Sequence, residues 1–285
     1  YMQSRPADLN EYINKKILPE LVYDEYRNFK WLDEMGGDDD KMIHFVETIR
    51  EIMKEFDETC DMVISIGGDG SFLKIVHELQ YPKCIFTGIN TGHLGFFQDS
   101  LPSEIDYLIN CIKNSNYEIQ KIIPLKATVK TSLRNFELHS INEFAIKGYK
   151  NKTVHVNLSI DGNHIESFSG DGIIISSSTG STAYNYSASG SIIDPRLNII
   201  QVTPIAPLNS NAYRSLTSSI ILPYKSKVKI TLENQYQNTT IFLADAIQFK
   251  YEKLQDIEIT YSNYKIKLLR LEKYRFWKKV KEKFL

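Results

Sequence analysis

The segment Gly67-Gly68-Asp69-Gly70 has residue types suited to phosphoryl transfer. It lies between a short apolar run and an amphipathic stretch, which predicts a strand, a turn and a helix. Glycines let a backbone approach a ligand closely, and amides at a helix N-terminus favour phosphate. An aspartate there would repel phosphate unless it orients or deprotonates a nucleophile or helps to hold a metal. The alternative is a tight turn with an incidental aspartate, and residue types alone favour neither.

Three other segments carry candidate binding residues, each with a simpler alternative. Residues 90–97, Asn-Thr-Gly-His-Leu-Gly-Phe-Phe, contain two aromatics that we expect to be exposed and that could shape a nucleotide base pocket. The alternative is a loop whose phenylalanines fill the core. The hydroxyl-rich residues 177–187 could bind ribose and phosphates, or form a loop and an N-capped helix. Asn142-Glu143 could hold ribose hydroxyls, or simply begin a strand.

Alternating strands and helices would position the first two of these segments. Apolar runs at 62–66 and 84–89 predict strands, and apolar side chains spaced by three and four residues within 42–56, 72–79 and 105–112 predict helices. This order is typical of a parallel sheet with helices packed on it. Ligands bind beyond the carboxyl ends of such strands, so we expect 67–70 and 90–97 to meet at one crevice.

The second half of the chain is predicted to be β-rich. Residues 154–160 alternate apolar and polar, and Asp161-Gly162 then predicts a hairpin turn. A short helix is expected near Ser181, and the apolar spacing within 276–284 predicts a last helix that packs on the first domain or on a partner. Further strands are expected at 144–146, 173–176, 199–202, 220–222, 228–232, 241–243 and 257–261.

Composition excludes several classes of protein. Lys and Arg total 34 against 35 Asp and Glu, which argues against a broad nucleic-acid-binding face. Three cysteines without a C-x-x-C pair disfavour a disulfide framework and a thiolate zinc site. The six histidines show no metal-ligand spacing, and no metal ligand is assigned. The absence of a membrane-crossing run and of a secretory signal predicts a cytoplasmic location.

In chain order, the motifs resemble the family of ATP- or polyphosphate-dependent NAD kinases. They are G-G-D-G followed by Phe72-Leu73, then N-T-G-H-L-G-F, Asn142-Glu143, G-D-G and T-G-S-T-A-Y. The resemblance runs from about residue 61 to the final Phe-Trp-Lys-Lys-Val. G-G-D-G alone also occurs in lipid kinases and phosphofructokinases, whereas the combination is specific.

The resemblance implies a phosphotransferase with an alcohol acceptor, the 2′-hydroxyl of the adenosine ribose of NAD. ATP, or polyphosphate, would be the donor with Mg²⁺ or another divalent cation, and NADP the product. Asp69 would be the general base, Phe96 would stack near adenine, and Asn142 and Glu143 would bind the ribose of the nicotinamide half. ATP phosphates would contact Gly67, Gly68 and Gly70. The implied NAD-binding residues are Gly70, Lys74, Phe96, Asn142, Glu143, Asp171, Thr179, Thr182, Ala183, Tyr184, Ser187, Ala206 and Asp245.

The expected architecture is a Rossmann-like α/β nucleotide-binding domain, residues 1–124 with 266–285 returning to it, and a β-rich NAD-binding domain, 125–265. The active site would lie between them, in a homo-oligomer, dimer or tetramer, without nucleic-acid or membrane partners. Ser169 stands where many relatives have arginine, and Ala246 where many have glycine or histidine. Two alternatives remain: a diacylglycerol-type lipid kinase, and a non-catalytic NAD(H)-binding regulator.

Overall fold

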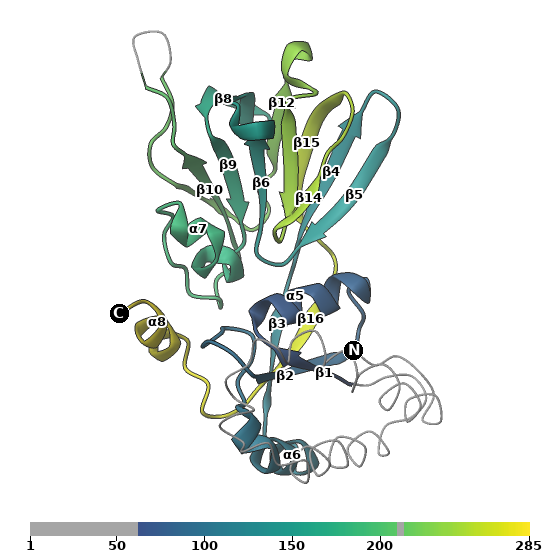
Figure 1. Cartoon of the computed structure of the whole chain (residues 1–285), viewed down its shortest axis with the longest axis vertical. Coiled ribbons are helices and arrows are strands. Elements are labelled where there is room, and N and C mark those ends of the chain that lie inside the picture. Colours follow the sequence, from purple (N-terminus) through teal and green to yellow (C-terminus); the bar gives the residue numbers. More distant parts are fainter. Residues whose placement is uncertain (1–61, 210–213) are drawn as a thin grey trace. The chain divides into compact units, whose positions relative to one another are not determined.

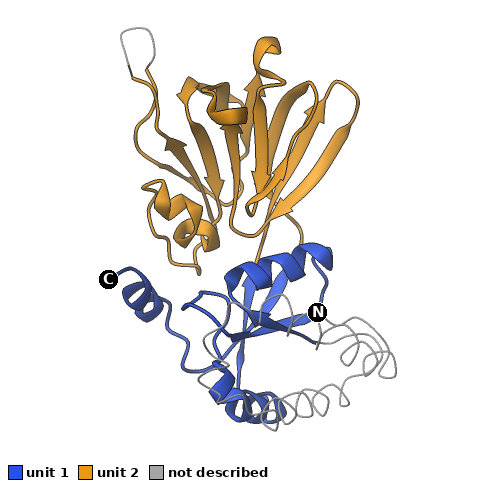
Figure 2. Ribbon diagram, viewed as in Figure 1, with its two compact units in different colours: residues 1–121, 265–285 blue, residues 122–264 orange. Residues whose placement is uncertain are grey.

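The structure, a computed structural model, describes residues 62–209 and 214–285. The helix expected within 42–56 lies outside these ranges. The chain divides into two compact units (Figure 2): unit 1 comprises residues 1–121 and 265–285, and unit 2 comprises residues 122–264. Within the described ranges, no helix combines the length and the apolar character that a membrane crossing requires.

Unit 1 contains a four-stranded sheet in the order β1-β2-β16-β3. The predicted strands are present as β1 (Met62–Gly67) and β2 (Ile85–Asn90), which pair in parallel. The sequence prediction missed β3 (Glu118–Ile122) and β16 (Ile266–Arg270). β16 comes from the far end of the chain and pairs in parallel with β2. Three neighbouring strands, β1, β2 and β16, are therefore parallel as expected, and the C-terminal region supplies the inner strand β16.

Helices pack on this sheet through apolar faces. The predicted helices are α5 (Asp69–Glu78), α6 (Ile105–Lys113) and α8 (Phe276–Phe284), and a short 3₁₀ turn, η3 (Pro102–Glu104), precedes α6. Phe72 of α5 is fully buried and stacks on Phe97, with ring centroids 4.5 Å apart. A second core cluster joins Met62, Ile89, Leu108, Cys111, Leu269 and Leu271.

Unit 2 is built from two six-stranded sheets whose mapped strand pairs are antiparallel (Figure 1). The first has the order β5-β4-β15-β12-β7-β8 and the second β11-β10-β9-β6-β13-β14. One apolar core holds buried side chains from both sheets. The strands of the first sheet are β4 (Leu125–Thr131), β5 (Asn135–Ser140), β7 (Val154–Ile160), β8 (Asn163–Gly170), β12 (Val228–Leu232) and β15 (Leu254–Tyr261).

The sequence predicted every strand of the second sheet except the last, Ile247–Phe249, and it also missed β4 and β5 of the first sheet. The strands of the second sheet are β6 (Glu143–Gly148), β9 (Gly172–Ser176), β10 (Ile199–Ile205), β11 (Ile220–Pro223), β13 (Thr240–Ala244) and β14 (Ile247–Phe249). The predicted hairpin turn joins β7 to β8, with positive φ of 50° at Asp161 and 82° at Gly162. The expected short helix consists of η5 (Thr179–Thr182) followed by α7 (Tyr184–Ser187), and the other 3₁₀ turns are η4 (Tyr149–Asn151) and η6 (Asn234–Tyr236). The predicted combination of an α/β unit and a β-rich unit is confirmed.

Candidate active site

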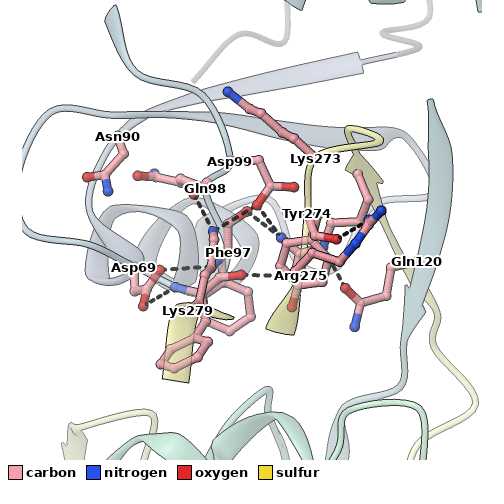
Figure 3. A network of polar contacts seen from close by, with 12 residues as sticks. Asp69, Asn90, Phe97, Gln98, Asp99, Gln120, Lys273, Tyr274, Arg275 and Lys279 are labelled. Carbon is pink, nitrogen blue, oxygen red and sulfur yellow. Dashed lines mark hydrogen bonds and ion pairs between the residues drawn. The ribbon is translucent and has the colours of Figure 1, made fainter. Parts of the chain in front are cut away.

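Asp69 is the first residue of α5 and immediately follows the β1 turn. Gly67 has φ of 137°, and a Cβ there would lie 2.2 Å from the Ser71 hydroxyl oxygen, so this tight turn requires glycine. The Asp69 carboxylate accepts hydrogen bonds from the Phe96 N–H at 2.9 Å and the Phe97 N–H at 3.0 Å (Figure 3). Residues 67–70 and 90–97 therefore meet, as the sequence predicted for two loops at one end of a parallel sheet.

Gly95 makes room for this carboxylate. A Cβ at Gly95 would lie 2.3 Å from Asp69 Oδ1, whereas a Cβ at Gly92 would meet no atom within 4 Å. The second glycine of the N-T-G-H-L-G-F motif thus has a steric task that the first does not share. Any larger residue at position 95 would collide with the Asp69 carboxylate in this position.

The two aromatic residues of this loop are buried, so the expectation that they are exposed was wrong. Phe97 stacks on Phe72 in the unit 1 core. Phe96 is 6% exposed and lies near two aromatic side chains of α8, Phe276 at 5.7 Å and Phe284 at 6.1 Å between ring centroids. The phenylalanines therefore fill the core, which is the alternative that the sequence left open.

Side chains of the C-terminal region bind Gln98 and Asp99, which directly follow Phe96 and Phe97 in the chain. The Arg270 guanidinium contacts Asp99 Oδ1 at 2.9 Å and donates to the Phe96 carbonyl oxygen at 2.9 Å. The Lys279 ammonium contacts Asp99 Oδ1 at 2.8 Å and donates to the Gln98 carbonyl oxygen at 2.8 Å. Burial lowers the pKa of Lys279, although Asp99 opposes this shift. Figure 3 shows Asp69, Phe97, Gln98, Asp99 and Lys279 within one network of polar contacts.

A second lysine of α8 lies at Asp69 itself. The Lys283 ammonium is 3.7 Å from Asp69 Oδ2 and 4.9 Å from the centre of the Phe96 ring. Sequence reasoning missed Lys283, Lys279, Arg270 and Asp99. The basic residues at the end of the chain were the available signal, but their spacing could not show what they contact.

In unit 2, Asp245 binds the segment that precedes β6. It lies with Ala246 in the turn from β13 to β14, where both residues have positive φ, 46° and 67°. Its buried carboxylate accepts from the Ser140 hydroxyl at 2.6 Å and from the N–H groups of Ile141 at 2.7 Å and Asn142 at 2.8 Å. Asp245 therefore fixes the backbone that presents Asn142.

Asn142 and Glu143 are buried, and each has an oxygen without a protein partner among the described residues, Oδ1 of Asn142 and Oε2 of Glu143. Burial, reinforced by the Asp245 charge, raises the pKa of Glu143 to about 8, against the lowering effect of the Tyr184 N–H. Buried acceptors normally have a hydrogen-bond partner. Each of these two oxygens therefore keeps an unfilled hydrogen-bonding position.

The hydroxyl-rich segment 177–187 packs against Asn142. The Ser177 N–H donates to the Asn142 carbonyl oxygen at 2.9 Å, and a Cβ at Gly180 would lie 2.1 Å from that oxygen. Of the predicted binding residues in this segment, Thr182 is buried, Ser187 is exposed, and Thr179, Ala183 and Tyr184 are intermediate. The structure thus brings Ser177 and Gly180 of this segment against Asn142, and the Tyr184 N–H against Glu143.

The other predicted residues are Asp171, Ala206 and Lys74, and Asp171 and Lys74 have contacts of their own. Asp171 and Ala206 are exposed, and the Asp171 N–H donates to the carbonyl oxygen of Ile205, next to Ala206. Ser169 is buried, with its hydroxyl 2.9 Å from His155 Nδ1. Lys74 of α5 has a largely exposed side chain, 4.0 Å from Glu78. Within 62–209 and 214–285, no group of three or more His, Cys, Asp or Glu side chains is arranged to hold a metal ion.

An α/β unit with a G-G-D-G aspartate at a helix N-terminus, joined to a β-rich unit with a buried Asn-Glu pair, defines a nucleotide phosphotransferase class. Comparison with known families identifies the family within this class. The ATP-NAD kinase N-terminal domain matches residues 10–117, and the ATP-NAD kinase C-terminal domain matches residues 141–271. The chain belongs to the NAD kinase family. The motif resemblance began at about residue 61, whereas the family match begins at residue 10. The additional matched residues lie outside the ranges that the structure describes.

Curated relatives agree with this assignment. The chain is 43% identical over 235 residues to the NAD kinase of Finegoldia magna, covering 81% of this chain and 86% of the relative. It is 35% identical over 249 residues to the NAD kinase of Staphylococcus saprophyticus, covering 86% and 91%. The predicted family and enzyme class are confirmed.

Solved structures share the fold. A yeast NADH kinase complexed with NADH has a TM-score of 0.70 and 22% identity, covering 79% of this chain and 65% of the yeast chain. An Archaeoglobus fulgidus NAD kinase in complex with ATP has a TM-score of 0.67 and 24% identity, covering 83% and 94%. At these identities the likeness supports the fold alone.

Proposed function

We propose that this chain transfers the γ-phosphoryl group of ATP to the 2′-hydroxyl of the adenosine ribose of NAD, forming NADP. The observation that carries the proposal is the buried pair Asn142 and Glu143, with an unpartnered acceptor oxygen on each side chain. A ribose offers two adjacent hydroxyl groups, which match the Asn142 amide oxygen and the Glu143 carboxyl group, and Glu143 accepts such a donor once it has released its proton. The curated relatives are named NAD kinases, which supports NAD as the phosphoryl acceptor in this proposal.

Asp69 is the general base of the proposed reaction. It takes the proton of the 2′-hydroxyl while that oxygen forms its bond to the γ-phosphorus, and the bond from the γ-phosphorus to the ADP oxygen breaks. Each Asp69 carboxylate oxygen accepts one backbone N–H, and a carboxylate has about four acceptor positions, so capacity remains for a substrate hydroxyl. The same two N–H groups fix the direction of the carboxylate, which matters because phosphoryl transfer depends mainly on positioning and charge.

The residues grouped around Asn142 bind NAD in this proposal. Asn142 and Glu143 accept from ribose hydroxyls, and Asp245 acts through them by holding their backbone. Phe96 contributes its N–H to Asp69, while stacking of its ring on adenine stays a prediction because the ring is buried. The other proposed NAD-binding residues are Gly70, Lys74, Asp171, Thr179, Thr182, Ala183, Tyr184, Ser187 and Ala206.

The donor side is proposed to use the amides of Gly67, Gly68 and Gly70 at the start of α5, where a helix N-terminus favours phosphate. Mg²⁺ commonly binds through substrate phosphates with one or two carboxylates, rather than through an all-protein site. The described residues offer no three-ligand group, so we assign no protein metal site and derive no step through the cation. A cytoplasmic homo-oligomer stays part of the proposal, and sedimentation of the purified chain tests its assembly.

The test is a coupled assay for NADP with purified chain, NAD and either ATP or polyphosphate. Asp69→Asn should lower turnover by about 10²–10⁴-fold while NAD binding is largely kept, because general-base catalysis typically contributes that factor. Full turnover by this variant would exclude Asp69 as the base. Diacylglycerol with ATP tests the lipid-kinase alternative in parallel. Tight dinucleotide binding without NADP formation from any donor would instead indicate a regulator.

A further inference from the structure

The C-terminal helix α8 contacts the surroundings of Asp69 through side chains that the proposed reaction does not use. Lys279 is 12% exposed at its side chain, and its ammonium lies 2.8 Å from both the Gln98 carbonyl oxygen and Asp99 Oδ1. Lys283, one helical turn later, lies 3.7 Å from Asp69 Oδ2. A buried lysine is rare unless it is paired, and Lys279 is paired with the buried carboxylate of Asp99.

The loop held by Lys279 is the same loop that holds Asp69. Phe96 and Phe97 donate their N–H groups to the Asp69 carboxylate, and Gln98 and Asp99 follow directly in the chain. Arg270 binds Asp99 from the neighbouring strand β16 and also binds the carbonyl oxygen of Phe96. A displacement of this loop would therefore move both donors that orient the carboxylate.

Lys279 and Arg270 both contact one oxygen of the Asp99 carboxylate, and the other oxygen, Oδ2, has no hydrogen-bond partner among the described residues. Asp99 Oδ1 receives both cations, and Asp99 is 7% exposed at its side chain. The two cations approach from different elements, β16 and α8, so Asp99 links these elements to the loop. Lys279 is the contribution of α8 to this link.

We propose that Lys279 is a positioning residue for Asp69, acting through the loop from Phe96 to Asp99. The inference rests on the proposed role of Asp69 as the base. Its physical basis is that reacting groups must be held closely: a misplacement of 1 Å can cost about 10²-fold in rate. The C-terminal helix is thereby part of the machinery that orients the base, although it lies far from Asp69 in the sequence.

The test compares Lys279→Met and Lys279→Arg with a matched control, Lys278→Met, in the full chain. Lys278 is on the same helix with a 71% exposed side chain and lies 3.6 Å from Glu282. Hydrogen exchange of the Phe96 and Phe97 amides, followed by NMR, reports the bonds to Asp69 without any reaction. We expect faster exchange in Lys279→Met, partial recovery in Lys279→Arg and no change in Lys278→Met.

Kinetics supply the second readout. Lys279→Met should lower kcat by up to about 10²-fold with little change in KM for NAD, and Lys279→Arg should recover part of the loss. In an Asp69→Asn background, Lys279→Met should cause little further loss of kcat, because Lys279 affects the reaction only by positioning Asp69. Non-additivity of this kind is the mark of coupled residues.

Two results would overturn the inference: wild-type amide exchange and kcat in Lys279→Met, or an equal loss of kcat with and without Asp69. If Lys279→Met does not fold, Lys279→Gln, which keeps a donor for the Gln98 carbonyl oxygen, is held to the same outcomes. If the wild-type chain forms no NADP, the proposed function fails, and with it the catalytic meaning of the inference. The exchange data then still decide whether Lys279 holds the loop.

Discussion

Replacing Glu143 with glutamine should remove a strong pH dependence from the stability of the protein. Burial, with the charge of Asp245, raises the pKa of Glu143 to about 8 from an ordinary value of 4.5. The folded chain therefore binds a proton at pH values where the unfolded chain has released it. Stability from this group is fully present below pH 4.5 and is lost as the pH rises toward 8.

The size of the effect follows from these two values. Between about pH 5 and pH 7 nearly one more proton is bound in the folded state, and linkage converts this into a loss of roughly 2–3 kcal/mol. The glutamine side chain of the variant would be neutral throughout and close in shape to the protonated acid. In a chain of this size about 1 kcal/mol shifts Tm by ~2–4 °C, so the difference in Tm between the two proteins should change by roughly 5–10 °C.

Thermal unfolding of ligand-free wild type and Glu143→Gln across this pH range measures the difference directly. Using the difference cancels the other titrating groups, which both proteins share. A ¹³C-carboxyl NMR titration of Glu143 gives its pKa independently. A constant difference in Tm from pH 5 to pH 7, or a pKa of Glu143 near its ordinary value, would refute the reasoning.

Three further predictions follow from the same contacts. If ribose hydroxyls donate to ionised Glu143, NAD binding near pH 7 should release roughly 0.9 proton per site; calorimetry in buffers of different ionisation enthalpy measures this, and a Glu143→Gln variant that releases as much would contradict it. Gly95→Ala would place a Cβ 2.3 Å from Asp69 Oδ1 and should lower kcat by on the order of 10²-fold, whereas Gly92→Ala, with open space around its Cβ, should not; equal kcat in the two variants would argue against a fitted loop. Asp245→Ala leaves the buried N–H groups of Ile141 and Asn142 without their acceptor and should destabilise the protein by at least about 2 kcal/mol in urea unfolding, while exposed Asp171→Ala should have little effect.

Local pattern was enough to predict many elements of this fold. The strands β1, β2 and β7 and the helices α5 and α6 follow from apolar periodicity, which depends on neighbours in the chain. β16 was missed because its five residues, Ile-Lys-Leu-Leu-Arg, give a weak pattern. Its place beside β2 depends on a pairing across most of the chain, which periodicity does not contain.

In the candidate site, too, motifs identified residues, but contacts between residues far apart in the chain could not be predicted. Asn142 and Glu143 were identified by motif, and the structure adds that both are buried with an unpartnered oxygen. The loop sequence suggested exposed aromatics, because nothing in 90–97 reveals that Phe96 lies near aromatic side chains of α8. The assignment of Asp245 to ligand binding stays a prediction, and the structure adds that its carboxylate accepts hydrogen bonds from the backbone before β6.

The position of β16 has a consequence for synthesis of the protein. β16 lies between β2 and β3, so the sheet of unit 1 lacks an inner strand until the ribosome has passed residue 270. Unit 2 is one continuous segment, residues 122–264, and its strands all emerge before β16 does. Domains generally fold as units in the order in which they are synthesised. We therefore expect unit 2 to fold as a unit without needing the C-terminal strand, while β1 and β2, although made first, complete their sheet only once β16 is available.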